Sequence, residues 1–293
     1  MTAHTEIQTP KSSAEEAAWI RALSALERDP SIRNPDSLAA CFVEKRRWTL
    51  AFPRVMRFVL ERMAPGGYWY HLARTKHIDE ILDSNLAAGL RQLVILGAGF
   101  DSRPHRFHDR LRAGHVKTFE LDFPSTQALK QKRLSRKIST VLNDHAYVPI
   151  DFNTQLLEHC LRQTSYHVNA RTLFIWEGVS MFLTPDAVDR TLDFIRAHSA
   201  RGSELVFDYI VRTAIQGDHS AYGAKQSFKY ASRLGEPYRF GLEPPEVRSF
   251  LEARGFEMRS DCGGLQLERS HLASTNGERR VWGFIRLVHA RTV

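Results

Sequence analysis

The stretch LVILGAGFDSR, residues Leu93–Arg103, decides the fold of this 293-residue chain. Its first four residues are apolar, which is typical of a short strand that is buried on both faces of a sheet. Gly97 and Gly99 end this strand in a tight turn, and a helix can begin near Asp101 or Ser102, since both residue types cap helix N-termini. Doubly wound α/β folds bind nucleotide-like ligands where a strand, a glycine turn and a helix follow in this order.

Strands and helices alternate along the chain from residue 91. The expected strands are Leu93–Leu96, Val116–Leu121, Tyr147–Ile150, Leu173–Trp176 and Glu204–Tyr209, with two closing strands near Glu257–Ser260 and Val281–His289. The expected helices between them lie near Pro104–Arg112, Pro124–Arg136, Asn153–Gln163 and Thr184–Ser199. Repeated strand–helix units predict a mostly parallel α/β sheet, to which the closing strands add an antiparallel edge.

Residues 1–90 show helical patterns and no strand pattern, with helices expected at Pro53–Met63 and about Tyr68–Leu86. We therefore predict a helical N-terminal cap over residues 1–90 and an α/β core over residues 91–293. Near residues 210–245 the alternation of strands and helices stops. We interpret this part of the core as an insertion on the substrate side.

Composition limits the class of protein and its partners. Hydrophobic residues make up 43% of the chain, but no apolar run is long enough to cross a bilayer, so we expect no membrane partner. The three cysteines have neither disulfide nor metal-ligand spacing, which favours a cytoplasmic protein. The formal net charge is +8, yet the basic residues are spread along the chain, so we interpret them as solvated surface rather than as a nucleic-acid site.

Acidic residues follow three of the expected strands. Glu120 and Asp122 end the second strand, Asp151 and Phe152 follow the third, and Glu177 follows the fourth. The carboxyl ends of parallel strands meet at one edge of the sheet, where a carboxylate can accept hydrogen bonds from ribose. This anionic rim matches a cofactor with a sulfonium and an ammonium better than a pyrophosphate.

Several motifs together resemble leucine carboxyl methyltransferases and their bacterial relatives, which are class I S-adenosylmethionine-dependent methyltransferases. The motifs are LVILGAGFDSR, FELDFP, ART at Ala73–Thr75, LFIWEGVSMFLTP, and GEPYRFGLEPPEVRSFLEARGF at Gly235–Phe256. The resemblance implies a Rossmann-like sheet with a helical N-terminal cap. It also implies S-adenosyl-L-methionine as the cofactor and S-adenosyl-L-homocysteine as its product.

The resemblance further implies which residues hold the cofactor. They are Arg74 for the methionine carboxylate, Gly97, Ala98 and Gly99 beneath the methionine part, Glu177 near the ammonium, Asp122 and Glu120 for the ribose, and Asp151 and Phe152 for the adenine. Arginine suits the first role because its guanidinium can grip a carboxylate with two hydrogen bonds.

The insertion is aromatic and partly basic, and it supplies the candidate substrate residues Tyr222, Tyr230, Tyr238 and Arg239. No motif residue is an obvious general base, which favours a carboxylate acceptor because carboxylic acids are already ionised at neutral pH. We therefore predict O-methylation of a small organic acid, polyketide-like or another secondary metabolite, to a methyl ester.

Two alternatives and one rejected site complete the sequence-based hypotheses. A nicotinamide-dependent oxidoreductase would use the same rim, but Ser102 stands where the dinucleotide pattern G-x-G-x-x-G has its third glycine. A non-catalytic protein that binds S-adenosylmethionine would show the same motifs. His105 and His108 have the spacing of a helical metal pair, but no third ligand follows nearby, so we expect no metal.

Overall fold

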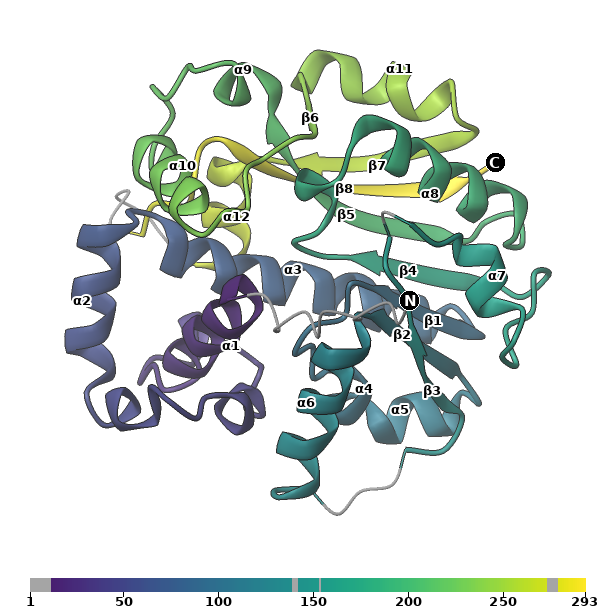
Figure 1. Cartoon of the computed structure of the whole chain (residues 1–293), viewed down its shortest axis with the longest axis horizontal. Coiled ribbons are helices and arrows are strands. Elements are labelled where there is room, and N and C mark those ends of the chain that lie inside the picture. Colours follow the sequence, from purple (N-terminus) through teal and green to yellow (C-terminus); the bar gives the residue numbers. More distant parts are fainter. Residues whose placement is uncertain (1–11, 139–141, 153, 273–278) are drawn as a thin grey trace, which may run out of the picture.

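A computed structural model describes residues 12–138, 142–152, 154–272 and 279–293. One mixed sheet runs through the molecule, with helices on both of its faces and a group of N-terminal helices beside it (Figure 1). This is the α/β architecture with a mostly parallel sheet that the alternating pattern predicts.

The sheet has the strand order β3-β2-β1-β4-β5-β8-β7, and β6 pairs with β5 beside this path. The parallel strands are β1 (Gln92–Leu96), β2 (Lys117–Asp122), β3 (His145–Pro149), β4 (Thr172–Trp176), β5 (Glu204–Val211) and the two-residue β6 (Gly241–Leu242). The antiparallel strands are β7 (Phe256–Cys262) and β8 (Ile285–Thr292). The chain reverses its direction of winding between β1 and β4, and a ligand crevice is expected at such a point.

Each face of the sheet has its own apolar core, because alternate residues of a strand point to opposite faces. On one face, Val94 and Leu96 of β1 share a core with α7 (Leu157–Leu161), α8 (Pro185–Ala197) and α11 (Val247–Glu252). On the other face, Leu93 and Ile95 pack with α3 (Gly67–Ala87) and α5 (His108–Ala113). All residues of β1 are buried, as expected for a strand covered on both faces.

The N-terminal part contains helices and no strand among its described residues. It comprises α1 (Ser12–Ser24), short 3-10 helices at Pro30–Ile32, Ala39–Phe42 and Arg47–Ala51, and α2 (Pro53–Met63), followed by α3. The first half of α3 packs against α1, whereas its second half lies on the sheet. The proposed cap of residues 1–90 and the core therefore share α3, and their division stays a prediction.

The remaining helices differ most from the sequence-based expectation. The segment after the glycine turn forms two short helices, α4 (Arg103–Arg106) and α5, and α6 (Pro124–Ser135) follows β2. The proposed insertion contains α9 (Arg212–Ile215) and α10 (Ala224–Arg233), and α12 (Gly264–His271) precedes β8. The expected helix near Asn153–Gln163 is shorter, and Asn153 lies outside the described residues.

The last strand begins four residues later than expected. Val281 and Gly283 instead bind other parts of the chain, since the Val281 amide donates to Glu268 Oε1 (2.7 Å) and the Gly283 amide donates to the Tyr222 carbonyl (3.0 Å). No helix within the described residues is long and apolar enough to span a membrane.

The glycine turn after β1 needs glycine for a physical reason. Gly97 has φ +66°, and a Cβ placed there would lie 2.3 Å from Cγ2 of Val179, which belongs to the loop after β4. The two loops that form the crevice therefore approach each other more closely than any other residue type allows.

We predict that Gly97→Ala destabilises the protein by about 2–4 kcal/mol, combining a left-handed backbone with a steric clash. Gly89→Ala is the matched control, because Gly89 also has a positive φ (+82°) but open space around its Cβ position. The control should lose only about 1–2 kcal/mol. Urea unfolding of both variants measures the difference, and equal losses would contradict the proposed close approach.

Candidate functional site

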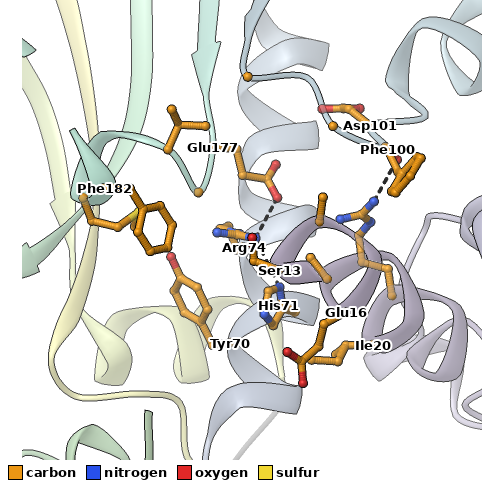
Figure 2. Close-up of a pocket in the computed structure, with 18 of the residues that line it drawn as sticks. Ser13, Glu16, Ile20, Tyr70, His71, Arg74, Phe100, Asp101, Glu177 and Phe182 are labelled. Carbon is orange, nitrogen blue, oxygen red and sulfur yellow. Dashed lines mark hydrogen bonds and ion pairs between the residues drawn. The ribbon is translucent and has the colours of Figure 1, made fainter. Parts of the chain in front are cut away.

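A cavity of about 270 Å³ lies at the carboxyl ends of the parallel strands. Its walls come from α1, α3, the glycine turn, the loop after β4 and the proposed insertion. Figure 2 shows Ser13, Glu16 and Ile20 of α1 close to His71 and Arg74 of α3, with Glu177 and Phe182 approaching from the sheet side. Residues far apart in the sequence thus form one site.

Asp122 organises the glycine turn. The amide of Gly99 donates to Asp122 Oδ2 (2.5 Å), and the amide of Phe123 donates to Oδ1 (2.6 Å). Burial raises the pKa of Asp122, while these two amides favour its ionised form and lower the pKa. Asp122 therefore lines the cavity on one side and holds the turn that lines it on another.

Arg74 is the central charged residue of the cavity. Its Nη1 binds Asp208 Oδ2 (2.5 Å), and its Nη2 lies 3.0 Å from Glu177 Oε1. Its Nε is buried and has no hydrogen-bond partner among the described residues. Because a buried donor without a partner is costly, this N–H marks a position for an acceptor atom of a ligand, such as a carboxylate oxygen.

Glu177 lies between two arginines. Its Oε2 is 2.8 Å from Nη1 of Arg103, and its Oε1 binds Arg74. Burial alone would raise the pKa of Glu177, but the two guanidinium groups lower it well below the usual range. The carboxylate is therefore ionised and presents negative charge to the cavity.

The charged residues around the cavity favour a cationic ligand. Six of the lining residues are acidic, namely Glu16, Asp36, Asp101, Asp122, Glu177 and Glu236. Four are arginines, namely Arg21, Arg74, Arg103 and Arg106. The excess of acid over base matches a ligand that carries a sulfonium and an ammonium beside a single carboxylate.

The opposite half of the cavity has an aromatic wall. Tyr238 stacks on Phe182 with ring centres 5.4 Å apart, and Tyr70 stacks on Trp282 at 5.1 Å. The amides of Arg239 and Phe240 both donate to the Met181 carbonyl, at 2.7 and 3.2 Å. These bonds attach the proposed insertion to the loop after β4. We call the half of the cavity lined by Tyr70, Phe182, Tyr238 and Trp282 the acceptor half, because the substrate residues predicted from the sequence belong to the insertion.

The residues expected from the sequence divide into two groups. Those that line the cavity are Arg74, Gly97, Ala98, Gly99, Asp122, Phe152, Glu177, Tyr230 and Tyr238. Those that do not are Glu120, Asp151, Tyr222 and Arg239. Their roles in binding stay predictions, but the structure shows what Glu120 and Tyr222 contact instead.

Glu120 is fully buried and points into the protein. It binds Nζ of Lys130 and accepts from Nε2 of His145 (2.9 Å), and these partners lower its pKa despite its burial. Tyr222 lies beneath Arg280, whose guanidinium carbon is 3.9 Å from the ring centre. Both residues have local partners that the linear pattern does not reveal.

Sequence reasoning missed Asp208 and two residues of α3. Asp208 of β5 is fully buried and accepts hydrogen bonds from Tyr70 (2.8 Å), Arg74 and the Gly178 amide (2.7 Å). His71 lines the cavity beside Arg74, with Nδ1 at 3.1 Å from Nη2. The available signal was a carboxylate, Asp208, in the middle of an apolar run of the strand ELVFDYIV.

Comparison with known proteins decides the family. Residues 14–196, more than half of the chain, match the family described as leucine carboxyl methyltransferase. The chain belongs to the leucine carboxyl methyltransferase family. This assignment agrees with the expected enzyme class and with the expected cofactor, S-adenosyl-L-methionine.

Relatives of this methyltransferase include YktD of Bacillus subtilis strain 168, provisionally named an S-adenosyl-L-methionine-dependent methyltransferase. YktD is 30% identical over 184 residues, which cover 63% of this chain and 60% of YktD, so the match spans less than two thirds of that relative. A protein of Mycobacterium sp. strain JLS with the same provisional activity is 30% identical over 238 residues, covering 79% of this chain and 74% of its own.

Solved structures show the fold of the methyltransferase. A DUF574 family protein from Streptomyces avermitilis superposes with a TM-score of 0.61 at 13% identity, covering 94% of this chain and 97% of its own. A protein from Thermobifida fusca, provisionally titled a methyltransferase, superposes with a TM-score of 0.59 at 14% identity, covering 98% and 96%.

The residues of this methyltransferase fit its cofactor. The unpartnered Nε of Arg74 suits a methionine carboxylate, and the excess of acidic residues suits a sulfonium. The lack of room for a side chain at Gly97 suits a close backbone approach. We infer that Arg74 and Glu177 hold the methionine end and that Asp122 holds the ribose.

We predict that Asp122→Ala weakens binding of S-adenosyl-L-homocysteine ten- to a hundredfold, or about 1.5–3 kcal/mol, because it removes the ribose acceptor and the anchor of the glycine turn. Tyr238→Phe, in the acceptor half, should leave this affinity unchanged. Calorimetric titration measures both. A folded Asp122→Ala variant with unaltered affinity would contradict the assignment.

We also predict that Lys130→Met costs about 3–5 kcal/mol of stability at neutral pH, because it leaves Glu120 as a buried charge with a single partner. Lys132→Met, an exposed change on the same helix, is the control. Folding lowers the pKa of Glu120, so the ion pair stabilises the folded protein fully at pH values above the pKa of Glu120 in the unfolded chain. This stabilisation is lost as the pH falls through the lowered pKa of the folded protein. Urea unfolding should therefore show that the difference in free energy of unfolding between Lys130→Met and wild type becomes smaller below about pH 4.5. A difference that stays constant with pH would show that it does not come from the Lys130–Glu120 ion pair.

Proposed function

We propose that the whole protein transfers a methyl group from S-adenosyl-L-methionine to a carboxylate oxygen of a small, largely apolar organic acid, which yields a methyl ester. The observation that carries the proposal is the state of His71, the one imidazole among the described residues that line the cavity. A methyltransferase that acts on alcohols or phenols usually needs a base to remove a proton, whereas a carboxylate acceptor needs none.

His71 is not available as a base. A guanidinium has no acceptor atom, so Nδ1 of His71 must accept from Arg74, and the single proton of the neutral ring then lies on Nε2. Burial and the nearby charge of Arg74 hold the pKa of His71 well below its usual value. The imidazole is therefore neutral, and the lone pair of Nδ1 is occupied by the hydrogen bond from Arg74.

The other polar groups of the acceptor half are mainly donors. The hydroxyl of Tyr70 donates to Asp208, and burial next to that carboxylate raises its pKa. Burial also raises the pKa of Tyr238, whose hydroxyl lies 3.1 Å from Ser227 Oγ. Protonated hydroxyls of this kind can orient a carboxylate, but they cannot activate an alcohol.

Carboxylates are present in this half, but they are weak bases. Glu16 forms a hydrogen bond with Tyr230. Burial, together with this hydrogen bond, raises the pKa of the Tyr230 phenol. Burial raises the pKa of Glu16 above its ordinary value, but a carboxylate is still a far weaker base than an alkoxide or phenoxide and removes such a proton poorly. An acceptor that is already ionised avoids this step.

When bound, S-adenosyl-L-methionine supplies an electrophilic methyl group on sulfur. The chain's own residues have three tasks: Arg74 and Glu177 orient the methionine end, the hydroxyls of Tyr238 and Ser227 position the acceptor, and the aromatic wall excludes water. Such alignment is what a direct displacement chiefly requires. The apolar lining, which includes Leu60, Met181, Phe182, Leu234 and Ile285, favours an apolar body such as a polyketide-like acid.

We predict an alkali-labile methyl ester as the product and a kcat that is nearly constant from about pH 6 to 8, because carboxylic acids stay ionised there. The experiment uses methyl-labelled cofactor with a panel of apolar aromatic acids and with the matching alcohols and phenols. An alkali-stable ether whose rate rises tenfold per pH unit would contradict the proposal. Cofactor binding without turnover of any acceptor would support the non-catalytic alternative.

A further inference from the structure

An unusual group of exposed apolar side chains lies on α2 and the residues before it. The described residues include eleven large apolar side chains that are exposed, and six of them fall between residues 48 and 63. These are Trp48, Phe52, Val55, Phe58, Val59 and Met63, of which Trp48, Phe58 and Met63 are each more than 60% exposed. Figure 1 shows α2 at the outer edge of the molecule, away from the sheet.

The side chains on the opposite side of α2 already have partners within the protein. Leu60 is buried in the core that α1 and α3 share, and Arg57 pairs with Glu27 (2.7 Å). Glu61 accepts from the Gly66 amide (3.1 Å), so this acid also turns inward. The outer side of α2 therefore carries Val55, Phe58, Val59 and Met63 together with the exposed Arg54 and Arg62.

The charge around these side chains is strongly positive. Residues 45–63 contain six basic residues and one acidic residue, Glu61. Burial raises the pKa of Glu61 to about 7, which weakens even this negative charge at neutral pH. Lys45, Arg46, Arg47, Arg54 and Arg62 are all exposed.

We propose that residues 45–63 form a binding surface for an anionic lipid bilayer. Large aromatic and aliphatic side chains on one side of a helix, flanked by lysine and arginine, are the pattern of helices that lie in the interface of a membrane. The apolar side chains would enter the region of the lipid headgroups, and the basic residues would pair with acidic headgroups. The sequence-based expectation of no membrane partner considered spanning segments, whereas an interfacial helix lies on the surface.

A second copy of the chain fits this surface less well. A two-fold contact through α2 would place each helix against the same helix of its partner. Arg54 and Arg62 would then meet arginines, and the outer side of α2 offers no carboxylate to pair with them. An acidic lipid surface supplies both the apolar phase and the negative charge.

The position of α2 also relates the bilayer to the cavity. Leu60 on its inner side and Ala64 just after it line the acceptor half, while the outer side would lie on the membrane.

The test measures sedimentation of the intact protein with vesicles of phosphatidylcholine alone and of phosphatidylcholine mixed with phosphatidylglycerol. We expect binding to the mixed vesicles that weakens with added salt, and little binding to the neutral ones. Phe58→Ser/Met63→Ser should lower the affinity for mixed vesicles about tenfold or more, because it removes the apolar anchor. Arg54→Glu/Arg62→Glu should lower it similarly and remove much of the salt dependence.

Matched controls carry the same changes elsewhere on the surface. Leu156 and Leu265 are exposed like Phe58, and Arg162 and Arg248 are exposed like Arg54 and Arg62. Leu156→Ser/Leu265→Ser and Arg162→Glu/Arg248→Glu should therefore bind vesicles like wild type. Unaltered binding of S-adenosyl-L-homocysteine shows that each variant is folded, and vesicle binding does not depend on which acceptor is methylated.

Three results would overturn the proposal. One is the absence of binding to mixed vesicles, even if an acidic protein is then found to bind residues 45–63. Another is an equal loss of binding in the control variants. The third is a dimer in light scattering that Phe58→Ser/Met63→Ser abolishes, since the surface would then bind a second copy.

Discussion

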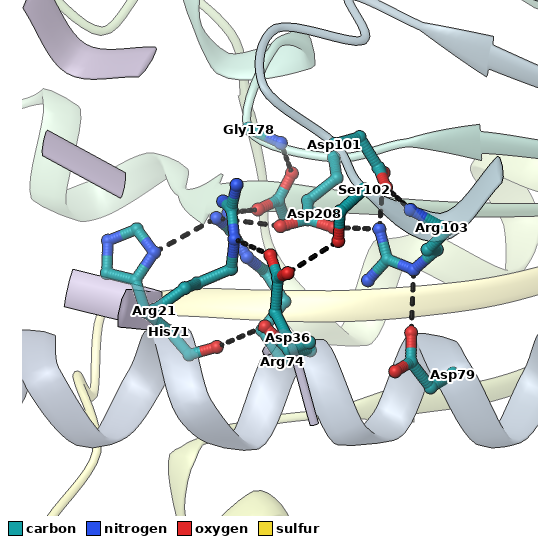
Figure 3. Close-up of polar contacts among 12 residues, drawn as sticks. Arg21, Asp36, His71, Arg74, Asp79, Asp101, Ser102, Arg103, Gly178 and Asp208 are labelled. Atoms are coloured by element: carbon teal, nitrogen blue, oxygen red, sulfur yellow. Dashed lines mark hydrogen bonds and ion pairs between the residues drawn. The ribbon is translucent and has the colours of Figure 1, made fainter. Parts of the chain in front are cut away.

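The ion pairs of Arg74 with Asp208 and Glu177 join the N-terminal helices to the sheet. Arg74 belongs to α3 and Asp208 to β5 (Figure 3), whereas Glu177 belongs to the loop after β4. All three side chains are nearly excluded from water. Removing one member would leave an uncompensated buried charge, which costs more than the pair itself contributes. These ion pairs therefore fix the position of α3 on the rim of the sheet, and with it the shape of the cavity between α3 and the sheet.

Further alternating charges extend this connection around the cavity. Arg103 binds Glu177 and Asp79, and Asp79 also binds Arg106 (2.6 Å). On the other side, Arg21 of α1 binds Asp36 (2.8 Å) and donates to the Phe100 carbonyl (2.8 Å) beside the glycine turn. Each of these residues lines the cavity or contacts one that does. The contacts that hold the N-terminal helices on the sheet therefore also shape the cavity. Nε of Arg74 has no partner within this network among the described residues, so under the proposed role of Arg74 the cofactor would bind directly to it.

The sequence predicted those features that depend on local pattern. The apolar run at Leu93 and the glycines after it indicate a buried strand and a turn, and both are present with nearly the expected bounds. How deep a side chain lies was not predictable, because depth depends on neighbouring strands. Glu120 and Asp122 are two residues apart on β2, yet the first is buried against Lys130 and His145 whereas the second reaches the cavity. Arg74 was found only through a family resemblance, and its partner Asp208 comes from a strand more than a hundred residues later.

The net charge of +8 shows most clearly what composition leaves out. The structure places an excess of acidic residues around the cavity and an excess of basic residues on the outer surface at residues 45–63. The two meet at α2, whose inner side reaches the cavity through Leu60 and whose outer side carries Arg54 and Arg62. A cationic cofactor and an anionic partner can therefore bind the same small protein without competing, since the charges that attract each lie on different sides of the N-terminal helices.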